Sequence, residues 1–87
     1  MTALVDHNSP QEIARRRTVA ADVVLDGVDL DGYPHRHLGV FSKQRFAHAG
    51  ITEILAAADV LARSGWELVQ VGEFGKGTLL CAVLRRA

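Results

Sequence analysis

The stretch SGWELVQVGEFGKGTLLCAVLRR, residues 64–86, decides the fold that this sequence predicts. Its β-branched and aliphatic residues predict one strand over 66–74 and a second over 78–86, and GKG at 75–77 predicts a tight hairpin turn between them. A strand with one solvated face alternates apolar and polar residues, but the second strand is apolar on both of its faces. We therefore expect both faces of this hairpin to be buried.

The segment ITEILAAADVLARSG at 51–65 predicts the main helix, which comes directly before the hairpin. Its apolar residues recur at spacings of three and four and form a single stripe that can cover one face of a sheet. Gly65 is suited to a left-handed C-cap that ends this helix. An earlier start near Ser42 or Phe46 stays open, although Gly50 disfavours that extension.

Shorter elements are predicted in the first half of the chain. SPQE at 9–12 predicts an N-cap, so a short helix is expected over about 10–16. TVAADVVL at 18–25 and HRHLGVF at 35–41 each predict a strand, and the two Asp-Gly pairs between them predict turns. The predicted fold class is therefore α+β, with a small antiparallel sheet of about four strands, one main helix packed on one face, and a short N-terminal helix.

Length and charge exclude several classes of protein. The 87 residues make a single domain, expected at 9–87 after a mobile tail at 1–8. Ten basic residues balance ten acidic ones, which disfavours nucleic-acid binding. The first residues do not read as a signal peptide, and no run approaches the ~20 apolar residues of a membrane helix. We expect a cytoplasmic protein without a membrane or nucleic-acid partner, and without an internal disulfide because Cys81 is the single cysteine.

The second face of the predicted hairpin lacks a helix to cover it. We expect this face to carry Leu79, Cys81 and Val83 from the last strand and Val69 and Val71 from its partner. Burying a Leu or Val side chain contributes ~1.5–3 kcal/mol, so exposure of the whole set would be unfavourable. The face is therefore expected to form the interface of a homo-oligomer, with a dimer as the first expectation. The alternative is that the N-terminal segment covers it within the same chain.

LARSGWELVQVG at 61–72 resembles a bacterial family of small domains catalogued as domain of unknown function 4177. Members of that family carry a helix that ends in Leu-x-x-x-Gly-Trp-Glu-Leu-Val and leads into a strand, a pattern that Leu61 and GWELV at 65–69 match. The resemblance covers the C-terminal half of the chain. The first half departs from it, because ADVVL at 21–25 stands where the family has an aromatic first strand. The resemblance implies a similar fold and brings no established activity or catalytic residue.

His35, His37 and His48 are the candidate ligand-binding or metal-binding residues. On a strand, His35 and His37 would point to the same face, where two imidazoles can chelate a metal. His48 or an acidic residue would complete the coordination shell. The alternative is that these histidines are solvated at a polar strand end, and no cofactor is expected.

The predicted function is a small interaction or assembly module. It would self-associate through its apolar sheet face or dock on a larger protein, and no catalytic residue is needed for either. One alternative is a small dimeric enzyme of α+β-barrel type, with Tyr33, His35, His37 and His48 as the polar groups of a pocket between sheet and helices. The other is a metal-binding or ligand-binding domain that uses His35 and His37.

Overall fold

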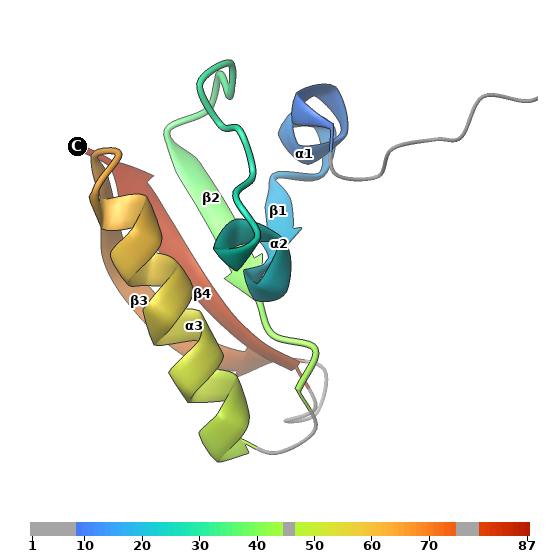
Figure 1. The fold of residues 1–87 in the computed structure, drawn as a ribbon, viewed down its shortest axis with the longest axis vertical. Coiled ribbons are helices and arrows are strands. Elements are labelled where there is room, and N and C mark those ends of the chain that lie inside the picture. Colours follow the sequence, from blue (N-terminus) through green and yellow to red (C-terminus); the bar gives the residue numbers. More distant parts are fainter. Residues whose placement is uncertain (1–8, 45–46, 75–78) are drawn as a thin grey trace, which may run out of the picture.

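The computed structural model describes residues 9–44, 47–74 and 79–87 as an α+β fold with one main helix and an open four-stranded sheet (Figure 1). The predicted tail at 1–8 and the predicted hairpin turn at 75–77 lie outside the described residues. The elements, in chain order, are α1 Pro10–Arg16, β1 Thr18–Ala20, α2 Ala21–Leu25, β2 His37–Phe41, α3 Ala47–Ala62, β3 Trp66–Phe74 and β4 Leu79–Arg86.

The strands follow the order β1-β2-β4-β3 across the sheet. β4 pairs antiparallel with both β2 and β3, whereas β1 pairs parallel with β2. The predicted α+β class is confirmed, but the sheet is mixed rather than antiparallel throughout. Parallel neighbours need a crossover connection, and α2 with the loop after it supplies this connection.

The strand predicted over 18–25 is wrong beyond Ala20, because residues 21–25 form α2. Helical spacing turns Ala21 and Val24 inward, and both are buried. α2 packs against α3, so it covers a part of the sheet that a longer strand would have left open. Tertiary packing therefore overrides the β-propensity of the two valines in this segment.

The short helix α1 matches its sequence prediction. The Oγ of Ser9 accepts the backbone N–H of Glu12 at 3.2 Å, and Pro10 occupies the first helical position. Arg17 ends the helix in the left-handed region at φ 64°. Ile13 is the buried residue of α1 and anchors this helix to the core, and Ala14 packs beside it.

The main helix α3 begins before Gly50, and this glycine lies inside it. A Cβ atom at Gly50 would lie 3.3 Å from Leu80 Cδ2 and 3.4 Å from Ser42 Oγ. Glycine therefore lets the first turns of α3 approach the ends of β2 and β4 closely. This close packing outweighs the unfavourable helix propensity of glycine.

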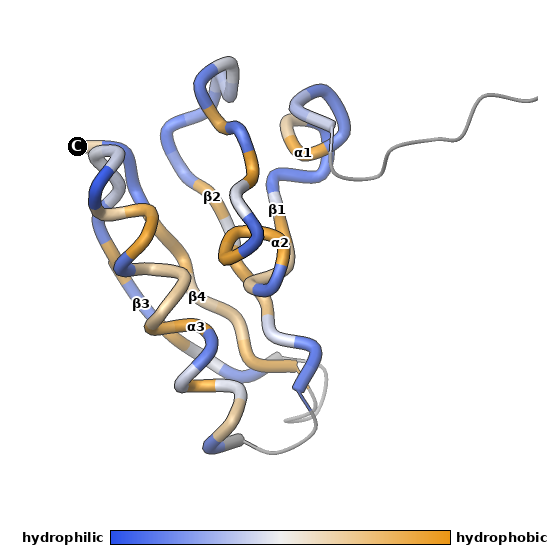
Figure 2. Tube along the Cα trace, in the orientation of Figure 1, coloured by the Kyte–Doolittle hydropathy of each residue, from blue (hydrophilic) through white to orange (hydrophobic). Residues whose placement is uncertain are grey.

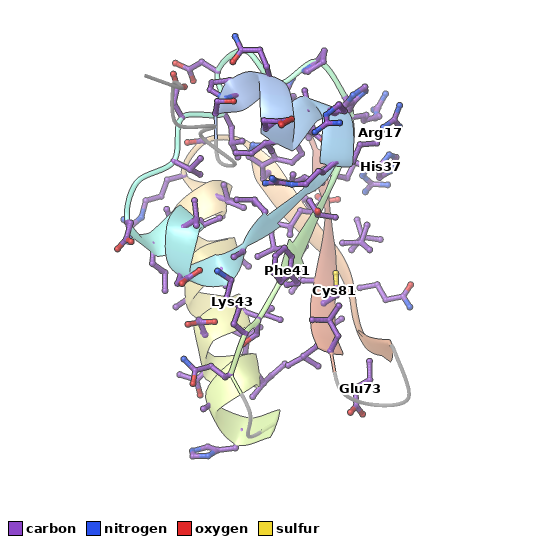
Figure 3. All side chains as sticks on the ribbon, turned by 90° about the vertical axis from the view of Figure 1, so that its right-hand side faces the viewer. Arg17, His37, Phe41, Lys43, Glu73 and Cys81 are labelled. Atoms are coloured by element: carbon purple, nitrogen blue, oxygen red, sulfur yellow. The ribbon has the colours of Figure 1, made fainter. Side chains whose placement is uncertain are left out.

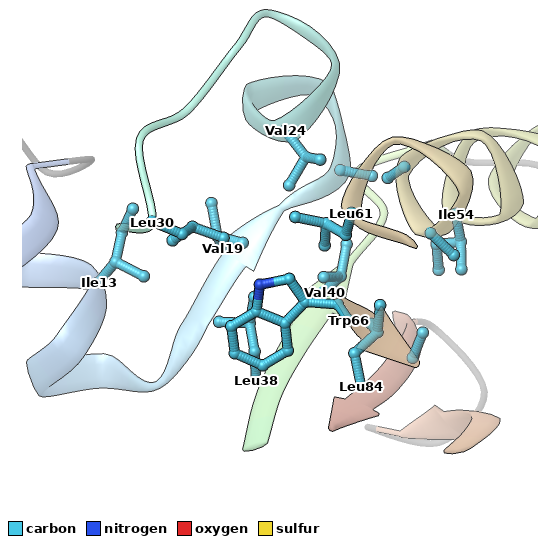
Figure 4. Close-up of a cluster of buried hydrophobic side chains, with 14 of the residues drawn as sticks. Ile13, Val19, Val24, Leu30, Leu38, Val40, Ile54, Leu61, Trp66 and Leu84 are labelled. Atoms are coloured by element: carbon cyan, nitrogen blue, oxygen red, sulfur yellow. The ribbon is translucent and has the colours of Figure 1, made fainter. Parts of the chain in front are cut away.

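The apolar core lies between the sheet and the two helices α2 and α3 (Figures 2 and 4). Leu38, Val40, Ala82 and Leu84 face it from the central strands, and Ile54 and Leu61 face it from α3. Within the described ranges no helix combines the length and the apolar content needed to cross a membrane.

Candidate functional site

The face of the sheet turned away from α3 is the candidate site, here called the outer sheet face. Side chains alternate between the two faces of a strand, so the residues between the buried core positions of β2 and β4 point outward. The register of paired strands then defines the set. Its exposed and half-buried members are Thr18, His37, Gly39, Phe41, Glu67, Val69, Gln70, Gly72, Leu79, Cys81, Val83 and Arg85.

No helix in the described part of the chain covers the outer sheet face. α2 and α3 both lie on the other side of the sheet, and α1 lies beside β1 with Ile13 in the core (Figure 1). In Figure 3, Cys81 and His37 lie on the side of the sheet that faces away from α2 and α3. Residues 9–17 therefore do not cover the outer sheet face, and neither does α3.

Apolar side chains are exposed on the outer sheet face. Val69 is 50% exposed and Leu79 is 38% exposed, while Phe41, Cys81 and Val83 are half-buried. Five large apolar or thiol side chains thus share one surface with two glycines. Large exposed apolar patches on small proteins are commonly interaction surfaces.

Val71 does not belong to this face, contrary to the sequence prediction. A β-bulge between Leu68 and Gln70 makes Val69 and Gln70 together oppose Val83. Val71 therefore pairs with Ala82 and packs against the core. Strict alternation along the strand had placed Val71 beside Val69, and the extra residue of the bulge reverses that assignment.

Cys81 lies at the middle of the outer sheet face, opposite Phe41 on β2 and Gly72 on β3. Burial raises the pKa of its thiol above the usual value, and a backbone hydrogen bond from Val40 offsets part of this rise. The thiol is therefore protonated at neutral pH and acts as a small apolar group. This favours contact with an apolar surface over nucleophilic chemistry.

One end of the outer sheet face is basic. Arg85 forms an ion pair with Glu67 across the β3–β4 pair, and His37 lies opposite Arg85 on β2. Arg17 reaches the same end, as Figure 3 shows. The other end carries Leu79.

The three candidate histidines do not converge. β2 begins at His37, so His35 precedes the strand and its Nε2 lies 3.0 Å from the carbonyl oxygen of Ala14 in α1. His37 is exposed on the outer sheet face, and His48 lies in the first turn of α3 at the opposite end of the molecule. The described residues contain no cluster of three or more His, Cys, Asp or Glu side chains able to hold a metal.

Tyr33 does not complete an enzyme-like pocket with these histidines. It is 2% exposed, and its hydroxyl donates to the carbonyl oxygen of His37 at 2.7 Å. Its ring contacts His35 and Trp66 edge-on, with centroids 5.3 and 5.7 Å away. Tyr33 is thus a core residue that fixes the loop before β2.

The contributions of β1 and β2 to the outer sheet face were missed in the sequence. Thr18, Gly39 and Phe41 extend the patch beyond the β3–β4 hairpin. The alternation in HLGVF at 37–41 could have predicted this contribution. Leu38 and Val40 are buried, and His37, Gly39 and Phe41 alternate with them and point outward.

A scan against protein-family models, a search of curated proteins and a search of solved structures each return no match to this chain. The resemblance of LARSGWELVQVG to the small bacterial domains therefore stays a prediction.

Proposed function

We propose that this protein is an assembly module that forms a homodimer by packing its outer sheet face against the same face of a second copy. The observation that carries the proposal is the exposed apolar patch around Val69, Leu79 and Val83 on a face that no described helix covers. Two sheets packed face to face bury such side chains in a shared core.

The size of the sheet suits a dimer interface. The four strands contain 3, 5, 9 and 8 residues, which is 25 residues in total. At about 3.4 Å per residue and about 4.8 Å between strands, they cover a flat area of about 400 Å². This is the same order as the ~800 Å² of accessible surface that each partner buries in a standard interface. A second copy offers a surface of equal size and equal apolar character.

Charge favours one of the two symmetric arrangements. A two-fold axis parallel to the strands would bring the basic ends of both copies together, with Arg17, His37 and Arg85 facing their own counterparts. A two-fold axis across the strands moves each basic end away from that of the partner, towards the end that carries Leu79. Like charges repel across an interface, so the second arrangement is the one we propose.

The oligomeric state of two matched variants tests this proposal. Val83→Lys places a charge at the centre of the outer sheet face, while Leu55→Lys places the same charge on α3 at a side chain that is 44% exposed. We expect analytical ultracentrifugation to give a dimer for the unmodified protein and for Leu55→Lys, and a folded monomer for Val83→Lys. A monomer for the unmodified protein at high micromolar concentration would refute the dimer.

A further inference from the structure

A second candidate site lies on the helix side of the sheet, away from the outer sheet face. It is a hollow of about 260 Å³ between the loop after α2, the last turn of α3 and the start of β3. Val24, Leu61 and Trp66 form its apolar wall, and Asp29, Asp31 and Arg86 supply its charged groups. A concave site with an apolar wall and few polar groups is typical of small-molecule binding.

Arg86 packs against two aromatic rings and forms no ion pair with an acidic side chain among the residues that the structure describes. Its guanidinium carbon lies 4.7 Å from the centre of the Trp66 ring and 5.9 Å from the centre of the Tyr33 ring. Arg15 and Arg85, by contrast, form ion pairs with Glu12 and Glu67. The rings hold the guanidinium in place, and its N–H groups stay available to an acceptor.

Trp66 adds a second donor to the same hollow. The residue is 4% exposed, and its indole N–H donates to no atom within residues 9–44, 47–74 and 79–87. In that part of the chain no side-chain nitrogen or oxygen is both sealed from solvent and without a partner, so this N–H borders open space. Figure 4 shows the ring nitrogen on the edge turned towards Val24, another wall residue. The donor is therefore accessible to a molecule that enters the hollow.

We infer that this hollow binds a small monocarboxylate with an apolar body. The planar guanidinium of Arg86 matches a carboxylate, and the Trp66 N–H is a further donor beside it. The wall of Val24 and Leu61 takes the hydrocarbon part. Asp29 and Asp31 also line the hollow and are exposed. They repel any negative charge that enters, so dicarboxylates and phosphate esters are disfavoured more strongly than a monocarboxylate.

The volume limits the size of this ligand. About 260 Å³ corresponds to about nine water molecules at about 30 Å³ each. A carboxylate with a short branched or unbranched chain is of a size to fill this space. The site does not depend on the dimer, because its residues lie on the other face of the sheet.

Nuclear magnetic resonance of the indole N–H tests the inference directly. The chain has one Trp, so its ¹⁵N–¹H spectrum holds a single indole signal, which reports on Trp66. We expect 4-methylpentanoate at millimolar concentration to shift this signal in a saturable way. The neutral 4-methylpentanamide has the same body and is expected to bind at least about tenfold more weakly, because it offers Arg86 no charge.

Two variants assign the effect to the arginine. Arg86→Ala is expected to weaken binding of 4-methylpentanoate at least about tenfold, whereas Arg85→Ala, on the same strand but the opposite face, is expected to leave it unchanged. Equal binding of acid and amide, full binding by Arg86→Ala, or no saturable shift would overturn the inference. Should Arg86→Ala fail to fold, the comparison of acid and amide on the unmodified protein decides alone.

Discussion

Tyr33 links three parts of the molecule through one side chain. Its hydroxyl donates to the His37 carbonyl, its ring meets Trp66, and the guanidinium of Arg86 lies near both rings. A buried phenol with a hydrogen bond holds the loop between Leu30 and His37 against the core. Tyr33 therefore anchors the loop before β2, together with Leu30 in the core and the contact of His35 with the Ala14 carbonyl.

The titration of Tyr33 gives a prediction for alkaline pH. Burial raises the pKa of its phenol above the ordinary value, and Arg17 and Arg86 nearby lower it by a smaller amount. The folded state therefore favours the neutral phenol. This contribution to the free energy of unfolding is complete below about pH 10 and is lost as pH rises through the folded-state pKa.

Tyrosinate absorbance measures this directly, because Tyr33 is the only tyrosine. The folded protein should ionise at higher pH than the denatured chain, and Tyr33→Phe should lose this part of the alkaline destabilisation. At neutral pH the same variant should lower the free energy of unfolding by about 1 kcal/mol, the contribution of the lost hydrogen bond. Ionisation at the pH of free tyrosine would contradict the assignment.

The junction between α3 and β3 is controlled by Gly65. The last carbonyl groups of α3 receive 3₁₀-like bonds, with the N–H of Gly65 donating to the carbonyl of Ala62 at 3.2 Å. Gly65 then adopts φ 90°, which directs the chain into Trp66 at the start of β3. Residues with a Cβ atom disfavour this conformation.

Substitution of two glycines separates backbone strain from crowding. A Cβ atom would meet nothing within 4 Å at either Gly65 or Gly32, but only Gly65 has a positive φ. Gly65→Ala should therefore lower the free energy of unfolding by about 1 kcal/mol. Gly32→Ala should be neutral or stabilise by about 0.5 kcal/mol, because it restricts the unfolded chain. Urea denaturation of both variants checks the difference, and equal effects would exclude strain at Gly65 as the cause.

The two sides of the sheet differ in what covers them. Its helix side holds the core and the hollow at Trp66 and Arg86. Its outer face holds the exposed apolar patch through which we propose dimerisation. A small chain buries a limited fraction of its surface by itself, so a second copy would complete the burial of its sheet.

The alkylation rate of Cys81 measures whether a second copy buries the outer sheet face. The raised pKa of its thiol predicts slow alkylation at neutral pH, with a rate that keeps rising above the pKa of an ordinary thiol. In the proposed dimer Cys81 also lies in the interface, so dilution into the monomer should increase the rate at fixed pH. A rate that is fast at neutral pH and independent of concentration would contradict both the burial and the dimer.

Local sequence determined much of this fold. The cap at Ser9, the apolar stripe of α3, and the β-branched runs of β3 and β4 predict elements close to those observed. The alternation of side chains along β3 and β4 also predicts which residues of this hairpin point to the outer sheet face, except at Val71. These features depend on neighbours within a few residues, and burial leaves a periodic pattern on each element.

Tertiary structure alone decided the rest. Residues 21–25 form a helix because α3 offers that segment a surface, and β1 pairs parallel with β2 because the chain crosses over through this helix. The bulge that moves Val71 to the core depends on the register between two strands. Trp66 and Arg86 meet because the ends of β3 and β4 pair. Each of these outcomes depends on contacts between residues distant in the sequence, which leave no local pattern to read.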